Sequence, residues 1–232
     1  MTRAYVITLS DNKSSFEQAD ILIDSSAHYH NRFVIEKNKA TTSDEVVAEF
    51  LSENIKWNYP WSKQHLDIQT GLIKTAYETA DPKKRMACFM SHYKLWKKCA
   101  ETQEDLLIFE HDAKFIRPFD VEEVKNTKFS VISLNDPRGA TRRSGVYHEL
   151  LMGKGVTEVP WIDDQNVPQG LPGNSAYYLK PEGASRLLKL VSDFGAWPND
   201  AIMCKQLMMG KLGCLSKYAT VVQRTQPSTT TT

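Results

Sequence analysis

The sequence has no long hydrophobic run, and nothing in its 232 residues approaches the roughly 20 apolar residues that a membrane-spanning helix requires. Its N-terminal stretch, MTRAYVITLSDN, is only briefly apolar before polar residues follow. That pattern is typical of a first β-strand rather than of a signal peptide. We therefore expect a soluble, cytoplasmic protein with no transmembrane segment.

Cysteine is also scarce. The four residues Cys88, Cys99, Cys204 and Cys214 are scattered and form no C-x-x-C pair. Their spacing indicates neither a zinc site nor a disulfide framework. We interpret them as buried, reduced thiols of a cytosolic protein.

Neither sign of charge dominates. The chain has 29 Lys and Arg against 28 Asp and Glu, for a formal net charge of +1. Such a balance gives no overall field that would select nucleic acid or an anionic membrane, so we expect no nucleic-acid partner. Length and an ordinary composition suit one α/β domain, which we place at residues 1–224. Residues 225–232 form a polar tail that we expect to be disordered.

Strand and helix patterns alternate along the chain. Apolar runs predict strands at 4–9, 32–35, 106–109, 129–134, 175–179 and 219–222. Helical spacing predicts helices at 14–24, from Ser43, from Lys83, at 181–191 and at 200–209. Residues 147–164 are ambiguous and are compatible with a hairpin, and 54–82 form an aromatic loop. The alternation favours an α/β fold with a mostly parallel central sheet and helices on both faces.

Two carboxylates follow one of the predicted strands. Glu110 and Asp112 come directly after the apolar run 106–109. Residues two apart in extended chain point to the same side, at the end of the sheet where open α/β folds bind ligands. A hard cation such as Mg²⁺ or Mn²⁺ suits this pair, while His111 between them faces the other way. The alternative is a solvated turn.

Several motifs in order resemble glycosyltransferase family 25. Residues 88–99, CFMSHYKLWKKC, and 107–113, LIFEHDA, are similar to the family's C-x-x-S-H-x-x-x-W and to its strand ending in L-E-D-D-A. Further on, GNSAYYL at 173–179 with GA and LL at 183–188 resembles its G-x-x-A-Y-x-I and G-A-x-x-L-L, and PND at 198–200 resembles its P-x-D. The resemblance spans about residues 85–223. His111 replaces the central Asp of the family's E-D-D, and an early arginine-rich turn of many relatives is replaced by residues 10–13.

The resemblance implies a single GT-A type nucleotide-diphospho-sugar transferase domain. That family includes lipooligosaccharide and collagen galactosyltransferases, so the implied context is lipopolysaccharide or protein glycosylation. The implied enzyme is an inverting hexosyltransferase. It would move galactose or glucose from a UDP-sugar to a hydroxyl of a glycan, glycolipid or protein, with Mn²⁺ or Mg²⁺.

The resemblance also suggests roles for individual residues. Asp112 would ligate the cation, and Glu110 would bind the cation or the donor ribose. Asp200 would act as the base that deprotonates the acceptor hydroxyl, unless it merely caps the last helix. The other predicted donor contacts are Thr8, Leu9, Ser10, Arg85, Ser91, His92, Gly173 and Asn174. For these the alternatives are a plain turn at Gly173, a surface charge pair at Arg85 and a core histidine at His92.

Two other functions compete. His111 is compatible with a catalytically silent module that binds a nucleotide sugar or glycan without turnover. A nucleotidyltransferase would usually carry a glycine-rich phosphate loop after the first strand. Residues 10–15 contain no glycine, which disfavours that class.

Overall fold

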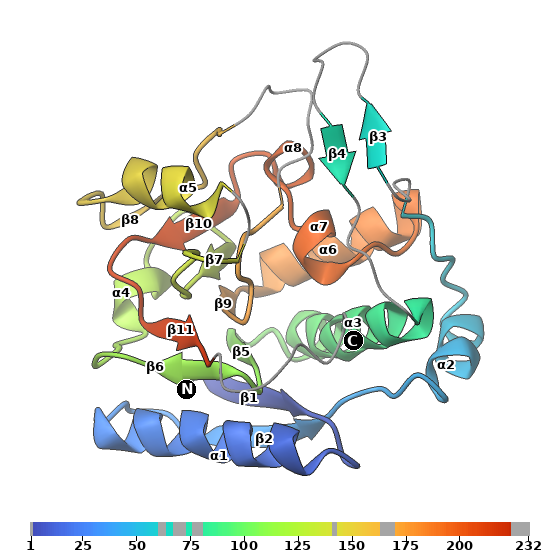
Figure 1. The fold of residues 1–232 in the computed structure, drawn as a ribbon, viewed down its shortest axis with the longest axis horizontal. Coiled ribbons are helices and arrows are strands. Elements are labelled where there is room, and N and C mark those ends of the chain that lie inside the picture. The colour runs from blue at the N-terminus through green and yellow to red at the C-terminus, as the bar shows by residue number, and fades with distance from the viewer. Residues whose placement is uncertain are drawn as a thin grey trace.

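A mixed β-sheet forms the centre of the molecule (Figure 1). The computed structural model describes residues 2–59, 81–140, 143–162 and 170–223, and the backbone at 64–66 and 73–75. Over these residues the strand order is β2-β1-β5-β9-β7-β10-β8. The strands are β1 Arg3–Thr8, β2 Ile35–Lys39, β5 Leu106–Glu110, β7 Val131–Ser133, β8 Val156–Glu158, β9 Ala176–Leu179 and β10 Leu212–Leu215.

Most strands of the described sheet run in one direction. β1 pairs in parallel with both β2 and β5, and β7 pairs in parallel with β10. β9 is antiparallel to its neighbours β5 and β7, and β8 is antiparallel to β10. The predicted mostly parallel sheet is therefore confirmed, with two strands reversed.

The helices and small sheets connect these strands. The helices are α1 Lys13–His28, α2 Val46–Ser52, α3 Pro82–Thr102, α4 Glu122–Lys125, α5 Ser144–Leu151, α6 Pro181–Phe194, α7 Asn199–Ile202 and α8 Lys205–Met208. Two antiparallel pairs lie outside the central sheet: β6 Ala113–Phe115 with β11 Thr220–Val222, and β3 Gln64–Leu66 with β4 Ile73–Thr75. Among the described helices, none is long and apolar enough to cross a bilayer.

Both faces of the sheet are buried, as predicted. In β1, Val6 packs in the cluster that includes residues of α1, whereas Tyr5 packs in the cluster that includes residues of α3 and α6. Helix α1 lies on one side of β1 and α3 on the other (Figure 1). In β5, Leu107 packs in the cluster with α1, and Ile108 packs in the cluster with α3 and α6. Both side chains are fully buried. Each fully buried apolar side chain stabilises the fold by about 1.5–3 kcal/mol. The two layers thus hold β5 firmly, and its carboxyl end carries the acidic residues.

Some predicted boundaries are wrong. The second strand lies at 35–39 rather than 32–35, because β2 is an edge strand whose charged side chains are mostly exposed. The helix expected from Ser43 begins at Val46, after Glu45. The helix expected at 200–209 is two short helices separated near Cys204.

Three other predictions about the second half of the chain need correction. Residues 147–164 hold no hairpin within their described part: α5 extends to Leu151 and β8 follows. The strand expected at 219–222 pairs with β6 and not with the central sheet. β10 was not predicted, since Gly213 in its middle weakens the strand pattern. A Cβ at Gly213 would lie 2.7 Å from the Phe129 ring, which explains the glycine.

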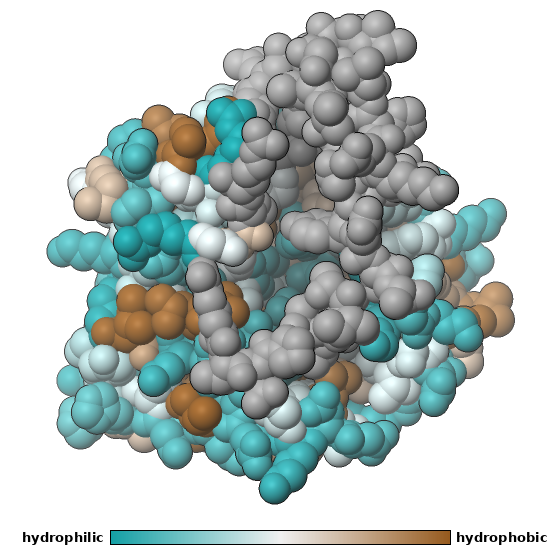
Figure 2. All heavy atoms as spheres, in the orientation of Figure 1, coloured by the Kyte–Doolittle hydropathy of each residue, from teal (hydrophilic) through white to brown (hydrophobic). Residues whose placement is uncertain are grey.

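The surface carries no dominant apolar area in the view of Figure 2, where hydrophilic residues cover most of the described part. The most exposed large apolar residues are Val34, Leu51 and Met209, on separate segments. The predicted tail at 225–232 and much of the aromatic loop at 54–82 lie outside the described residues.

Candidate active site

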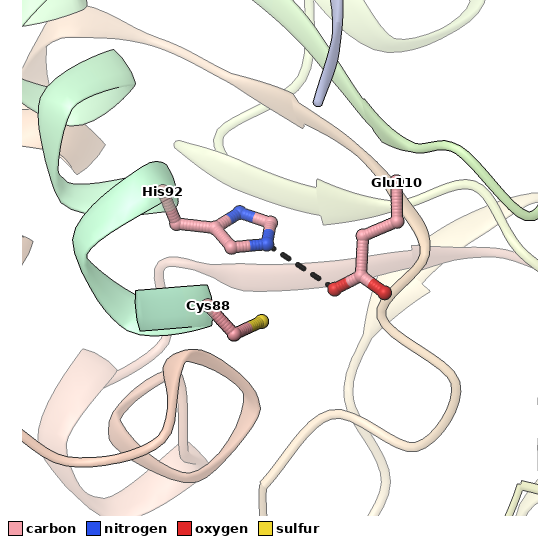
Figure 3. A group of neighbouring side chains, drawn as sticks. All are labelled: Cys88, His92 and Glu110. Carbon is pink, nitrogen blue, oxygen red and sulfur yellow. Dashed lines mark hydrogen bonds and ion pairs between the residues drawn. The ribbon is translucent and has the colours of Figure 1, made fainter. Parts of the chain in front are cut away.

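Helix α3 and the end of β5 bring the first part of the site together. α3 begins at Pro82, and the Asp81 carboxylate caps it by accepting from the Lys83 N–H at 2.9 Å. Cys88 and His92 lie one turn apart on α3 and point toward Glu110, the last residue of β5 (Figure 3). His92 Nε2 lies 3.2 Å from Glu110 Oε1.

On the side of its ring away from Glu110, His92 contacts a row of buried aromatic residues. Its Nδ1 lies 2.8 Å from the hydroxyl of Tyr177 on β9, and Trp96 Nε1 donates to the same hydroxyl at 2.9 Å. His92, Trp96 and Tyr177 are each at most 1% exposed. The Glu110 side chain, at 29% exposed, is the end of this row that reaches the surface.

Asp112 lies beside Glu110. The sequence predicts extended backbone between them, and this prediction is wrong. Residues 111–112 form a turn between β5 and β6. The two carboxylates are still close: burial first, and then the Glu110 charge, raise the pKa of Asp112 to about 7, with the Ser175 hydroxyl acting in the opposite direction. The Oδ1 atom of Asp112 is buried and has no hydrogen-bond partner among the described residues.

This pair fits a divalent cation. A buried carboxylate oxygen without a partner, next to a second carboxylate, is unfavourable unless a positive charge neutralises the pair. Mn²⁺ and Mg²⁺ prefer oxygen ligands of this kind. Among the described residues, the one group of three or more possible ligands within 4.8 Å of one another is Cys88, His92 and Glu110, which does not include Asp112. A cation between Glu110 and Asp112 would therefore need further ligands from a bound donor or water.

His111 forms a hydrogen bond with the backbone of β1. Burial lowers the pKa of its imidazole, while the Glu110 charge and a hydrogen bond to the Ile7 backbone act in the opposite direction. Its ring is thus directed to β1. The residue that departs from the family pattern leaves the two outer acids in place.

Asp200 and Arg85 lie within electrostatic range of the same site. Burial raises the pKa of the Cys88 thiol well above its usual range, and the charges of Glu110, Asp200 and Asp112 raise it further, while Arg85 lowers it. Burial and Asp200 also raise the pKa of Tyr59 to about 12, against the effect of Arg85. The three acids named in the sequence prediction therefore all act electrostatically on one thiol.

Helix α7 positions Asp200. Pro198 precedes the first residue of α7, Asn199, so the alternative in which Asp200 caps the helix is wrong. Asn199 Oδ1 lies 3.6 Å from Cys88 Sγ, which places the start of α7 against α3. An acidic side chain in the first turn of a helix is stabilised by the helix dipole.

The segment before β9 completes the site. Leu171 donates to the Asp200 carbonyl at 3.1 Å. Gly173 has φ +65°, which favours glycine, and the next side chain, Asn174, has a buried Oδ1 without a hydrogen-bond partner among the described residues. The following residue, Ser175, accepts the Glu110 N–H at 2.8 Å through its carbonyl. These two backbone hydrogen bonds, on either side of Gly173 and Asn174, connect the segment to Asp200 and to Glu110.

The remaining predicted donor contacts have different surroundings. Ser91 is buried, donates to the Ala87 carbonyl at 2.8 Å and accepts the Thr41 N–H at 2.9 Å, so its hydroxyl joins α3 to the segment after β2. Thr8, Leu9 and Ser10 follow the point where Ile7 pairs with Glu110, and so continue past the acids. Of these three, Ser10 is the exposed one.

Sequence reasoning missed several residues of the site. Cys88 was interpreted only as a buried thiol, and Tyr177 and Trp96 were assigned no role. The signal was present in the spacing, because positions 88, 92 and 96 are four apart and lie on one helical face.

Fold and site together define an α/β protein with three acids near the carboxyl end of a central strand. Residues 62–136 match the model of glycosyltransferase family 25 (LPS biosynthesis protein), which is 75 of the 232 residues. This segment is similar to that family, as the motifs predict.

Solved structures of glycosyltransferases match the chain at low sequence identity and with TM-scores below 0.5. A glycosyltransferase involved in glycosylation of the major capsid of PBCV-1 is 7% identical, with TM-score 0.45 over 97% of this chain and 95% of the other. An active-site mutant of LgtC is 9% identical, with TM-score 0.45 over 97% and 88%. Mouse xyloside xylosyltransferase 1 is 14% identical, with TM-score 0.46 over 92% and 84%. No curated protein sequence matches the chain.

Proposed function

We propose that this protein is an inverting glycosyltransferase that moves a hexose, galactose or glucose, from a UDP-sugar to a hydroxyl of a glycan, glycolipid or protein. The observation that carries the proposal is that Glu110, Asp112 and Asp200 all act electrostatically on the Cys88 thiol, while Asp112 Oδ1 is buried without a hydrogen-bond partner among the described residues. The family match over residues 62–136 supports the same class of reaction.

On the donor side, Asp112 and Glu110 would hold Mn²⁺ or Mg²⁺. The bound cation would neutralise charge that develops on the leaving diphosphate. Arg85 adds positive charge to the same region, since it lowers the pKa of Cys88 and Tyr59. Gly173 holds the turn before β9 in a positive-φ conformation, and the next residue, Asn174, offers a buried amide oxygen to a sugar hydroxyl.

On the acceptor side, Asp200 would act as the base. The acceptor oxygen forms a bond to the anomeric carbon while the bond from that carbon to the diphosphate breaks, and the bonding electrons leave with UDP. The acceptor proton passes to the Asp200 carboxylate. A positioned base of this kind contributes about 10²–10⁴-fold to the rate. Attack opposite the leaving group inverts the anomeric configuration.

The test is UDP release from a panel of nucleotide sugars, with simple glycosides as acceptors, in Mn²⁺ and in EDTA. We expect release from UDP-galactose or UDP-glucose that requires the metal, and a product with inverted configuration by NMR. Binding of the donor without any release would favour the silent module, and pyrophosphate production would favour a nucleotidyltransferase.

A further inference from the structure

Three hydrogen bonds join four side chains in one row: Trp96, Tyr177, His92 and Glu110. An indole N–H can only donate, so Trp96 must donate to the Tyr177 oxygen. The Tyr177 hydroxyl is fully buried, and its hydrogen needs an acceptor. Among the described residues, the one other hydrogen-bonding partner of that hydroxyl is His92 Nδ1, at 2.8 Å.

These constraints decide which nitrogen of His92 carries the proton. Tyr177 donates to Nδ1, so Nδ1 is the acceptor and the ring proton is on Nε2. Nε2–H then donates to Glu110 Oε1 at 3.2 Å. With the opposite tautomer, a nitrogen lone pair would face the carboxylate and the tyrosine hydrogen would have no acceptor, and both are unfavourable in a buried site.

We propose that His92 is a positioning residue: Trp96 and Tyr177 hold it as the Nε2–H tautomer, and it fixes the Glu110 carboxylate for the cation site. This inference rests on the proposed function for its consequence, but not for its geometry. Groups that orient a metal ligand in this way typically contribute 10–100-fold to metal affinity or activity.

A different role for His92 is suggested by Cys88, whose sulfur lies with Nε2 and the Glu110 oxygen within 4.8 Å of one another (Figure 3). A thiophilic ion bound there would need the Nε2 lone pair. The proton that Tyr177 directs to Nε2 occupies that position. The hydrogen-bond directions therefore favour positioning over ligation.

The tautomer can be measured directly. The chain has six histidines, and two-bond ¹H–¹⁵N correlation spectra of ¹⁵N-histidine protein with His92→Gln as the assignment control identify the His92 ring. We expect the Nε2–H pattern in the metal-free protein. An Nδ1–H pattern, or a thiolate-to-metal absorption band on Co²⁺ addition that disappears in Cys88→Ser, would overturn the inference.

The consequence for the cation is measured as Mn²⁺ affinity in the presence of UDP, by electron paramagnetic resonance of free Mn²⁺. His92→Leu should weaken binding about 10–100-fold. His92→Gln keeps an N–H donor and should remain near wild type. Tyr177→Phe removes the partner that fixes the tautomer and should give a mixed pattern in the NMR spectra.

The two proposals fail differently. Equal Mn²⁺ binding by wild type and His92→Leu would overturn the positioning role. Absence of Mn²⁺ binding in the wild type would overturn the proposed function, and the NMR pattern would still decide the tautomer.

Discussion

At the scale of single residues, the negative charge of Asp112 is unfavourable in the folded protein when no cation is bound. Its folded-state pKa of about 7 lies above its ordinary value of 3.8, so the folded protein holds this proton more tightly than the unfolded chain does. The contribution of this group to stability is therefore fully present at low pH and is lost as pH rises from about 4 to about 7.

Asp112→Asn should consequently stabilise the metal-free protein at pH 8, because it removes a buried negative charge next to Glu110. We expect a gain on the order of 1 kcal/mol or more in EDTA, measured by urea unfolding, with a smaller gain at pH 5 and little gain below pH 4, where the carboxyl is protonated in both states. Asp193→Asn is the control, since that carboxylate is an exposed partner of Lys189. A variant less stable than wild type at pH 8 would show that the charge is well compensated.

Asp200 lies near the other acids without being the helix cap. Asp200→Asn keeps the size of the side chain and removes its basicity. We expect kcat to fall about 10²–10⁴-fold while KM for the donor stays near wild type. Steady-state kinetics with the donor identified by the panel measure both constants. A loss confined to the donor KM would place Asp200 in donor binding instead.

At the scale of elements, helix α6 is held against β7 by one glycine. A Cβ at Gly183 would lie 2.5 Å from the Ser130 carbonyl oxygen, a backbone atom that cannot move aside easily. The glycine of the family's G-A motif is thus explained by close packing of a helix on a strand.

Gly183→Ala should destabilise the protein by about 1–3 kcal/mol through this overlap. Gly145→Ala in α5 is the matched control, because a Cβ there meets nothing within 4 Å and alanine favours helix. Thermal denaturation of both variants measures the difference. Equal midpoints for the two would show that α6 can shift without cost.

The elements that the sequence predicts best are those that the core holds most tightly. β5, β9, α3 and α6 have dense apolar patterns, and each lies where the pattern places it. β2 and β8 are edge strands with exposed or half-buried side chains, so their patterns carry little information. The reversal of β9 is likewise invisible in a pattern of alternation.

The site was predictable to the same extent. Glu110, Asp112 and Asp200 follow from the family motifs, whereas the extended backbone expected at 110–112 is a turn. The hydrogen bonds that join Tyr177 to His92 and to Trp96 depend on β9 lying next to β5, with Tyr177 opposite Ile108. No local pattern reports such a contact, since it joins segments about 80 residues apart.

At the scale of the whole molecule, the charge is nearly balanced, so the acids act locally and not as part of a large field. The central claim is that Asp112 and Glu110 hold a divalent cation with the donor diphosphate. The most direct test is Mn²⁺ binding in the presence of UDP, by electron paramagnetic resonance, for wild type, Asp112→Asn and the control Asp193→Asn. We expect one bound Mn²⁺ in wild type and in the control, and binding at least about tenfold weaker in Asp112→Asn. Equal Mn²⁺ affinity in all three proteins would contradict it.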